Sequence, residues 1–238
     1  MSAQFIGVGV GPGDPELITL KAYRLIQQAD VISYIANDKG ESQAKKIAVE
    51  ALNDVIKAQH EIPVIMPMCE DRQIANGIYD EAAVAIQGQI NAGKLVVFLC
   101  EGDPLFFGSF AYLLERLAHA NSCQVVPGIS SVHAASSALQ IPLTMLKESF
   151  AVISGRHTDE QLQSALLNHD SVVIMKAGRS RERILNALAA SNRTHEARYL
   201  EYIGRDGQRI ETDVAKLVGE AGPYFSLFVV VRQERDRT

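Results

Sequence analysis

The hydrophobic positions of this chain form short continuous runs separated by stretches with helical spacing. Continuous runs are typical of strands buried on both faces, and spacings of three and four residues are typical of amphipathic helices. Strands are predicted at residues 5–10, 31–35, 95–100, 124–126, 150–154, 171–176, 197–203 and 224–231. Helices are predicted from Asp14 onward and at 44–52, 74–92, 109–120, 133–139, 159–167, 180–190 and 213–219. This alternation of strands and helices predicts an α/β fold.

Less regular segments divide this pattern. Residues 62–68 contain two prolines, which favour an edge strand or irregular structure. Residues 140–149 have the composition of a connection between two halves. We therefore expect an N-terminal α/β domain over 1–120, a connecting segment over 121–148 that carries a Pro-Gly-Ile-Ser-Ser motif and a helix, and a C-terminal α/β domain over 149–238. A cleft is expected between the two lobes.

The stretch 95–110, LVVFLCEGDPLFFGSF, is the most informative part of the chain. A buried strand ends there in Gly102, Asp103 and Pro104, and open α/β sheets bind ligands beyond the carboxyl ends of their strands. Two interpretations of Asp103 remain open on these residues. Its carboxylate either accepts hydrogen bonds from amides of the turn or faces a ligand.

Two other glycine-containing turns follow predicted strands. The first, GVGVGPG at 7–13, fails the GxGxxG pattern because Pro12 or Asp14 falls at the third glycine position. Asp14 and Pro15 instead favour the start of a helix, and dinucleotide binding is not indicated. The second turn, PGISS at 127–131, fits either an ordinary capped helix or a close approach of a ligand to the backbone.

Composition and charge narrow the possible functions. The chain has 238 residues, a formal net charge of −5 and no Lys/Arg run long enough to make a basic stripe, which argues against nucleic-acid binding. Its three cysteines are widely spaced, so neither a disulfide framework nor a zinc site is indicated. No apolar stretch reaches the roughly 20 residues of a membrane span. The N-terminus lacks the features of a signal peptide. We expect a cytoplasmic protein that does not act at a membrane.

The order of the motifs along the chain is more specific than any one of them. GVGPGDP near residue 10, EGDP near 100, PGISS near 127, IMK near 175 and YFS near 225 resemble the tetrapyrrole (corrin/porphyrin) methyltransferases over essentially the whole chain. The segments CEGDPLFFGSFAYLLERL, MPM and SVVIMKAGRSRERI are most similar to the branch that methylates C20 of precorrin-2.

This resemblance implies two α/β domains of the tetrapyrrole methylase fold, distinct from Rossmann methyltransferases, with S-adenosylmethionine in the cleft between them. It also implies a homodimer and a trough for an anionic tetrapyrrole. Carried over by motif, the cofactor-binding residues are Pro12, Glu101, Gly102, Asp103, Phe106, Ser130, Ser131, Met175, Gly204 and Ser226. The segment IGRDGQRI departs from the family's Gly-Thr pattern, so the contact assigned to Gly204 falls there or within a few residues.

Several points stay open within the resemblance. No residue is identified as a general base, and Asp103 is assigned to binding rather than proton transfer. Lys39, Lys147 and Arg156, in predicted loops, are candidate partners for substrate carboxylates. The acceptor could carry cobalt. The chain could also methylate another position, or act as a non-catalytic tetrapyrrole-binding module of the same fold.

Overall fold

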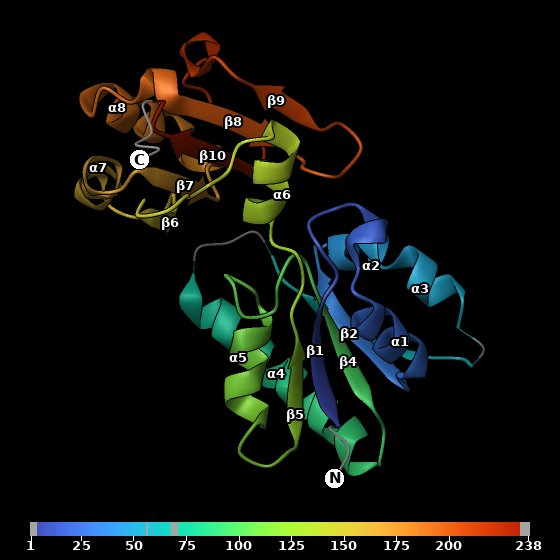
Figure 1. The fold of residues 1–238 in the computed structure, drawn as a ribbon. Helices are drawn as coiled ribbons and strands as arrows, with labels where there is room; N and C mark the ends of the chain where they lie inside the picture. The colour runs from blue at the N-terminus through green and yellow to red at the C-terminus, as the bar shows by residue number, and fades with distance from the viewer. Residues whose placement is uncertain (1–3, 56, 68–70, 234–238) are drawn as a thin grey trace. The chain divides into compact units, whose positions relative to one another are not determined.

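The structure, a computed structural model, describes residues 4–55, 57–67 and 71–233 and divides the chain into two compact units, Met1–Ser130 and Ser131–Thr238. Met68, the end of the MPM segment, and Cys69 lie outside the described residues. The first unit (Figure 1) contains β1 (Phe5–Gly9), the 3-10 turn η1 (Pro15–Leu17), α1 (Leu20–Gln28), β2 (Val31–Ala36), α2 (Gln43–Ile47), α3 (Val49–Asn53), β3 (His60–Ile65), α4 (Arg72–Asn91), β4 (Val96–Cys100), α5 (Phe110–Leu117) and β5 (Cys123–Val126).

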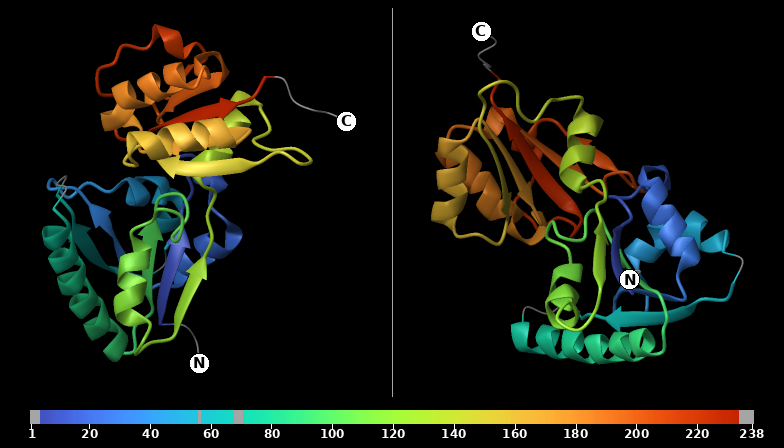
Figure 2. Two further views of the ribbon diagram at one scale, coloured as in Figure 1. Left: turned by 90° about the vertical axis from the view of Figure 1, so that its left-hand side faces the viewer. Right: turned by 60° about the horizontal axis from the view of Figure 1, so that its bottom comes forward.

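The strands of the first unit form a parallel sheet in the order β3-β2-β4-β1-β5. Helices α1, α2 and α3 pack on one face of it and α4 and α5 on the other, as Figures 1 and 2 show. Every residue of β1 and β4 is buried, because helices cover both faces of these central strands. β3, which contains Pro63, is an edge strand, as its prolines predicted.

Two helices predicted in this unit are interrupted. Asp14 accepts a hydrogen bond from the Glu16 amide, but the helix it caps is the single turn η1. Ile18 and Thr19 are extended, and the Thr19 hydroxyl accepts from the Ala22 amide to begin α1 as a separate helix. The helix predicted over 44–52 is likewise two short helices, α2 and α3, separated at Ala48.

The second unit contains α6 (Ser131–Leu139), β6 (Phe150–Ser154), α7 (Asp159–Asn168), β7 (Ser171–Met175), η2 (Gly178–Ser180), α8 (Arg181–Ala190), η3 (Thr194–Glu196), β8 (Ala197–Glu201), β9 (Arg209–Glu211), η4 (Val214–Lys216) and β10 (Ser226–Val231). Its sheet has the order β6-β7-β10-β8-β9, and only β6 and β7 are parallel. Helices α7 and α8 pack on one face and α6 on the other. The helix predicted at 213–219 is only the turn η4.

The segment predicted to connect two domains, 121–148, is shared between the two units. Its first part forms β5, which pairs with β1 as an edge of the first sheet. Its helix, α6, contributes Val132 and Ala135 to the hydrophobic core of the second unit. Residues 140–149 follow α6 and lead to β6.

Candidate functional site

The loops that follow β1, β4 and β5 meet at one edge of the first sheet. The three strands are neighbours and run parallel, so their carboxyl ends lie side by side. Two main-chain hydrogen bonds join the first two loops, Gly102 N to Gly11 O at 2.8 Å and Gly11 N to Gly102 O at 3.4 Å. Both glycines have positive φ, +86° at Gly11 and +63° at Gly102, where a side chain would be strained.

Glycine is also needed where the third loop approaches the other two. A methyl group at Gly128 would lie 2.1 Å from the carbonyl oxygen of Gly102 and 2.7 Å from the Cα of Gly9. A methyl group at Gly9 would lie 2.5 Å from the same oxygen. These are backbone atoms that cannot rotate away, so any larger residue would force the loops apart. The sequence motifs contained these glycines, but the contact between them depends on the strand order.

Asp103 holds the second and third loops together. Its Oδ1 accepts a hydrogen bond from the Leu105 amide at 2.9 Å, and its Oδ2 accepts one from the Gly128 amide at 3.1 Å. A carboxylate has about four acceptor positions, so both oxygens can still accept from a ligand. The structure therefore confirms that Asp103 accepts hydrogen bonds from loop amides. The same carboxylate retains acceptor positions with which it could also bind a ligand.

This edge also lies at a change of direction in the sheet. The chain leaves β1 toward α1 on one face and leaves β4 toward α5 on the other, although the two strands are neighbours. In open α/β sheets, ligands bind in the crevice outside the carboxyl ends of such a strand pair. A methyl group at Gly102 would meet nothing closer than the Ser130 Cα at 3.8 Å. That distance is an ordinary van der Waals contact, so glycine is favoured at this position by its positive φ and not by crowding.

The first-unit residues expected from the motifs all lie in these three loops. Pro12 follows β1, and Glu101, Gly102, Asp103 and Phe106 follow β4, whereas Ser130 follows β5 and is 5% exposed. The tip of the middle loop presents three consecutive apolar side chains, Leu105, Phe106 and Phe107, which are 54%, 36% and 44% exposed. Exposed apolar side chains that lie together are characteristic of ligand-binding surfaces.

Cys100, the last residue of β4, is not a candidate nucleophile. It is 4% exposed, and burial raises the pKa of its thiol far above the ordinary value. The thiolate, the reactive form, is therefore not populated near neutral pH. The chemistry at this edge thus depends on carboxylates, hydroxyls, main-chain groups and apolar surface.

Three of the residues expected in the second unit, Met175, Gly204 and Ser226, lie at one edge of its own sheet. Met175 ends β7 and Ser226 begins β10, beside the carboxyl end of β8, because β10 is antiparallel to both strands. Ser226 O accepts from the Ala177 amide at 3.2 Å, and its hydroxyl donates to Pro223 O at 2.7 Å. Gly204 lies in the turn after β8, where its amide donates to Gln208 Oε1 at 2.7 Å. Ser131 is the first residue of α6.

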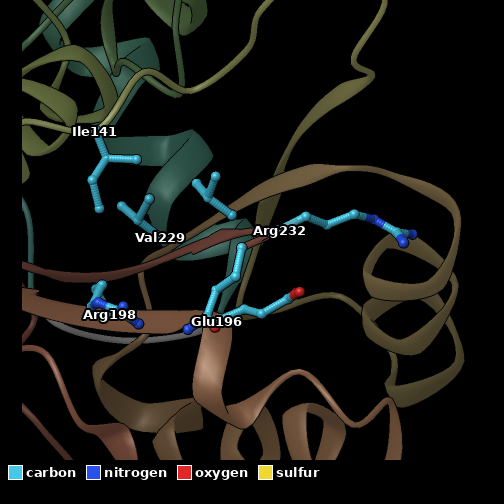
Figure 3. Close-up of a pocket in the computed structure, with 7 residues that line it drawn as sticks. Ile141, Glu196, Arg198, Val229 and Arg232 are labelled. Carbon is cyan, nitrogen blue, oxygen red and sulfur yellow. The ribbon is translucent and has the colours of Figure 1, made fainter. Parts of the chain in front are cut away.

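A pocket of about 140 Å³ in the second unit lies elsewhere (Figure 3). Its lining residues are Ile141, Glu196, Arg198, Val229, Val231, Arg232 and Gln233. Val231 is the last residue of β10 and Ser226 is the first, so the pocket lies toward the opposite end of this strand from Met175 and Ser226. It is therefore separate from the edge where the predicted residues gather.

The candidate cations lie in three different places. Lys39 is exposed in the loop after β2, and Arg156 is exposed after β6, two residues beyond Ser154, which pairs with Met175. Lys147 is exposed before β6 and so at the opposite edge of the second sheet. A cation that the sequence did not single out, Arg72, begins α4 and lies against Tyr112 of α5. No motif in the sequence marks Arg72, because its contact with Tyr112 arises only when α4 packs against α5.

In the part of the chain that the structure describes, no helix is both long and apolar enough to cross a membrane.

Comparison with known proteins gives consistent results. The family model for Tetrapyrrole (Corrin/Porphyrin) Methylases matches residues 4–218. A precorrin-2 C(20)-methyltransferase from Sinorhizobium sp is 37% identical over 234 residues, which are 95% of this chain and 94% of the relative. A cobalt-precorrin-2 C(20)-methyltransferase from Salmonella typhimurium is 28% identical over 98% of both chains. A uroporphyrin-III C-methyltransferase structure from Thermus thermophilus, in complex with S-adenosylhomocysteine, has a TM-score of 0.68 and 25% identity, covering 96% of this chain and 97% of that one.

Proposed function

The chain belongs to the tetrapyrrole (corrin/porphyrin) methylases, and we propose that it is an S-adenosylmethionine-dependent methyltransferase of cobalamin biosynthesis. The reaction proposed is methylation of C20 of precorrin-2 to give precorrin-3A. The observation that carries this proposal is the similarity to a precorrin-2 C(20)-methyltransferase, 37% identical over 95% of the chain. The match includes the three loops that meet beyond β1, β4 and β5.

The residues of the first unit fit S-adenosylmethionine chemically. The cofactor combines ribose hydroxyls, an aromatic base and a positively charged sulfur. The Asp103 and Glu101 carboxylates can accept from hydroxyls, and the Phe106 ring provides an apolar contact. The main chain at Gly102 allows close approach because no Cβ is present. We assign the cofactor to Pro12, Glu101, Gly102, Asp103, Phe106 and Ser130.

Residues of the second unit are proposed as further cofactor contacts on the family motif. These are Ser131, Met175, Gly204 and Ser226, with Tyr224, Phe225 and Ser226 near the adenine. Within this unit, the assignment is supported by the position of Met175 and Ser226. Met175 ends β7 and Ser226 begins the neighbouring strand β10, so the two residues lie at the same edge of the sheet.

The chemistry requires orientation more than a reactive side chain. When bound, the cofactor supplies a methyl group on a sulfonium, which is a good leaving group. The protein's part is to hold the acceptor carbon in line with that methyl group, and correct orientation can account for several kcal/mol of a barrier. Asp103 serves this role by fixing the loop that carries Phe106 against the loop that carries Gly128.

The metal content of the acceptor divides this proposal into two candidates. The Salmonella typhimurium relative, named a cobalt-precorrin-2 C(20)-methyltransferase, covers 98% of the chain at 28% identity. The Sinorhizobium relative, whose name does not include cobalt, is more similar at 37% identity. We favour metal-free precorrin-2 on this difference. We also propose that the enzyme acts as a homodimer, which the family resemblance implies and sedimentation can test. A cytoplasmic location is proposed from the sequence features alone.

The decisive experiment measures transfer of a labelled methyl group from S-adenosylmethionine to metal-free and to cobalt-loaded precorrin-2. We expect one methyl group per acceptor, at C20 by NMR, with a higher kcat/KM for the metal-free substrate. A preference for the cobalt form would reverse the choice between the two. Binding of S-adenosylmethionine without transfer to either substrate would overturn the proposal in favour of a non-catalytic module.

A further inference from the structure

Arg72 is held in place by Tyr112, an aromatic residue of the neighbouring helix α5. Its guanidinium carbon lies 5.2 Å from the centroid of the Tyr112 ring, and its Nη1 donates a hydrogen bond to the Tyr112 hydroxyl at 3.2 Å. Tyr112 is supported in turn by Tyr79 of α4, whose ring stacks on it at 4.9 Å between centroids. Arg72 is exposed, yet these contacts restrict the orientation of its charged group.

No carboxylate among the described residues forms an ion pair with Arg72. Arg116, near the C-terminal end of α5, also lies over a tyrosine ring. Its guanidinium carbon is 5.7 Å from the centroid of the Tyr79 ring. Its charge, however, is paired with Asp80, at 2.6 Å from Nε to Oδ1. Both arginines therefore lie against a tyrosine, but among the residues that the structure describes only Arg116 has an acidic partner.

The fold places Arg72 at the same edge of the first sheet as the candidate site. α4 ends at Asn91, and the turn at Gly93 leads into β4, so α4 runs antiparallel to that strand. The N-terminus of α4 therefore lies toward the carboxyl end of β4. α5 begins at this end too, directly after the loop that exposes Leu105, Phe106 and Phe107 (Figure 2). This edge thus combines an apolar tip with an oriented cation that forms no ion pair with the described residues.

We propose that Arg72 binds a carboxylate of the tetrapyrrole substrate, while the apolar tip of the β4–α5 loop lies against the macrocycle. This inference rests on the proposed function, because it assigns a residue to the substrate of that reaction. The expected ligand is a large apolar ring with carboxylates at its rim, and both parts of the surface match it. Besides the Nη1–H donated to Tyr112, the guanidinium has further N–H groups that can bind a carboxylate in a bidentate manner, which lysine cannot do.

The test is steady-state kinetics of Arg72→Gln with precorrin-2 and S-adenosylmethionine. We expect the KM for precorrin-2 to rise about fivefold, which corresponds to an exposed charge pair at the upper end of its usual range. The KM for S-adenosylmethionine should not change. The wild-type KM for precorrin-2 should rise with salt concentration, and this dependence should be weaker in the variant because one screened charge pair is gone.

Arg116→Gln is the matched control, since it removes a guanidinium from the same pair of helices. It should leave both KM values and the salt dependence as in the wild type. Arg72→Lys should fall between the wild type and Arg72→Gln. A precorrin-2 KM for Arg72→Gln equal to that of Arg116→Gln would overturn the inference. Absence of methyl transfer by the wild type would instead overturn the proposed function, so the two failures are distinguishable.

Discussion

Both carboxylate oxygens of Asp103 accept main-chain hydrogen bonds, from Leu105 at 2.9 Å and from Gly128 at 3.1 Å. The residue therefore joins two loops of the candidate site whether or not it also contacts a ligand. Asp103→Ala should weaken S-adenosylmethionine binding in calorimetry and also lower the free energy of unfolding by about 2 kcal/mol, at about 1 kcal/mol for each lost hydrogen bond. The two measurements together separate support of the loops from contact with the cofactor.

Asp103→Asn is the informative companion to this variant. It keeps an oxygen that can accept from one amide, but its NH2 group meets the other amide as a second donor. We expect stability between those of the wild type and the alanine variant. A full loss of binding in Asp103→Ala without any loss of stability would contradict the loop-supporting role. Unchanged affinity with normal turnover would exclude Asp103 from cofactor binding.

At the scale of elements, the meeting of three loops depends on glycine at Gly128. A methyl group there would lie 2.1 Å from the Gly102 carbonyl oxygen, and neither backbone can yield without separating the loops. Gly128→Ala should lower the free energy of unfolding by about 1–3 kcal/mol, the usual cost of overpacking, and should abolish detectable cofactor binding. Urea unfolding and calorimetry provide the two measurements.

Gly88→Ala is the control for the same chemical change elsewhere. Gly88 lies within α4, and a methyl group there would meet no heavy atom within 4 Å. Alanine should stabilise the helix by up to about 1 kcal/mol and leave cofactor affinity as it is. If Gly128→Ala behaved like Gly88→Ala, the close approach of the loops would not matter for the site.

Elements with strong patterns could be predicted from the sequence, and weaker ones could not. The runs that became β1 and β4 are apolar throughout because both faces of these strands are buried. The break between η1 and α1 was missed, because Thr19 begins a second helix within a pattern that looks continuous. β9 was missed as well, since it has three residues, Arg209–Glu211, at the edge of the second sheet.

At the scale of the whole molecule, the order of the motifs predicted the candidate site but could not predict the contacts between its loops. It identified the turns at Gly11, Gly102 and Gly128, and the strand order then brought them together. Arg72 could not be found this way, because its contact with Tyr112 arises where α4 packs against α5. A turn can be predicted from its own few residues, whereas a contact between two helices can be identified only once the fold is known.

Each unit also contains a carboxylate that joins separate segments and whose pKa is lowered by its partners. In the first unit, hydrogen bonds from Lys57 and then from the Leu95 amide, both at 2.8 Å, lower the pKa of Asp30. In the second, hydrogen bonds from the amide and hydroxyl of Ser149, both at 2.8 Å, lower the pKa of Asp170. The ionised form of each group thus stabilises the folded state.

A lowered pKa in the folded state fixes the direction of the pH dependence. The stabilisation is fully present above the unfolded pKa of about 3.9 and is lost as the pH falls through the lower folded value. Asp30→Asn and Asp170→Asn should each reduce the free energy of unfolding by about 1 kcal/mol at pH 7, and the difference from the wild type should shrink below about pH 4.

The two groups share no partner and lie in different units, so their effects should add in the double variant to within about 0.5 kcal/mol. Urea unfolding of the wild type, both single variants and the double variant between pH 7 and pH 3 measures all of these differences. A difference that stays constant down to pH 3 would mean that neither carboxylate stabilises the fold through its charge. If the double variant had the same free energy of unfolding as the less stable of the two single variants, the two units would not contribute independently to the stability of the molecule.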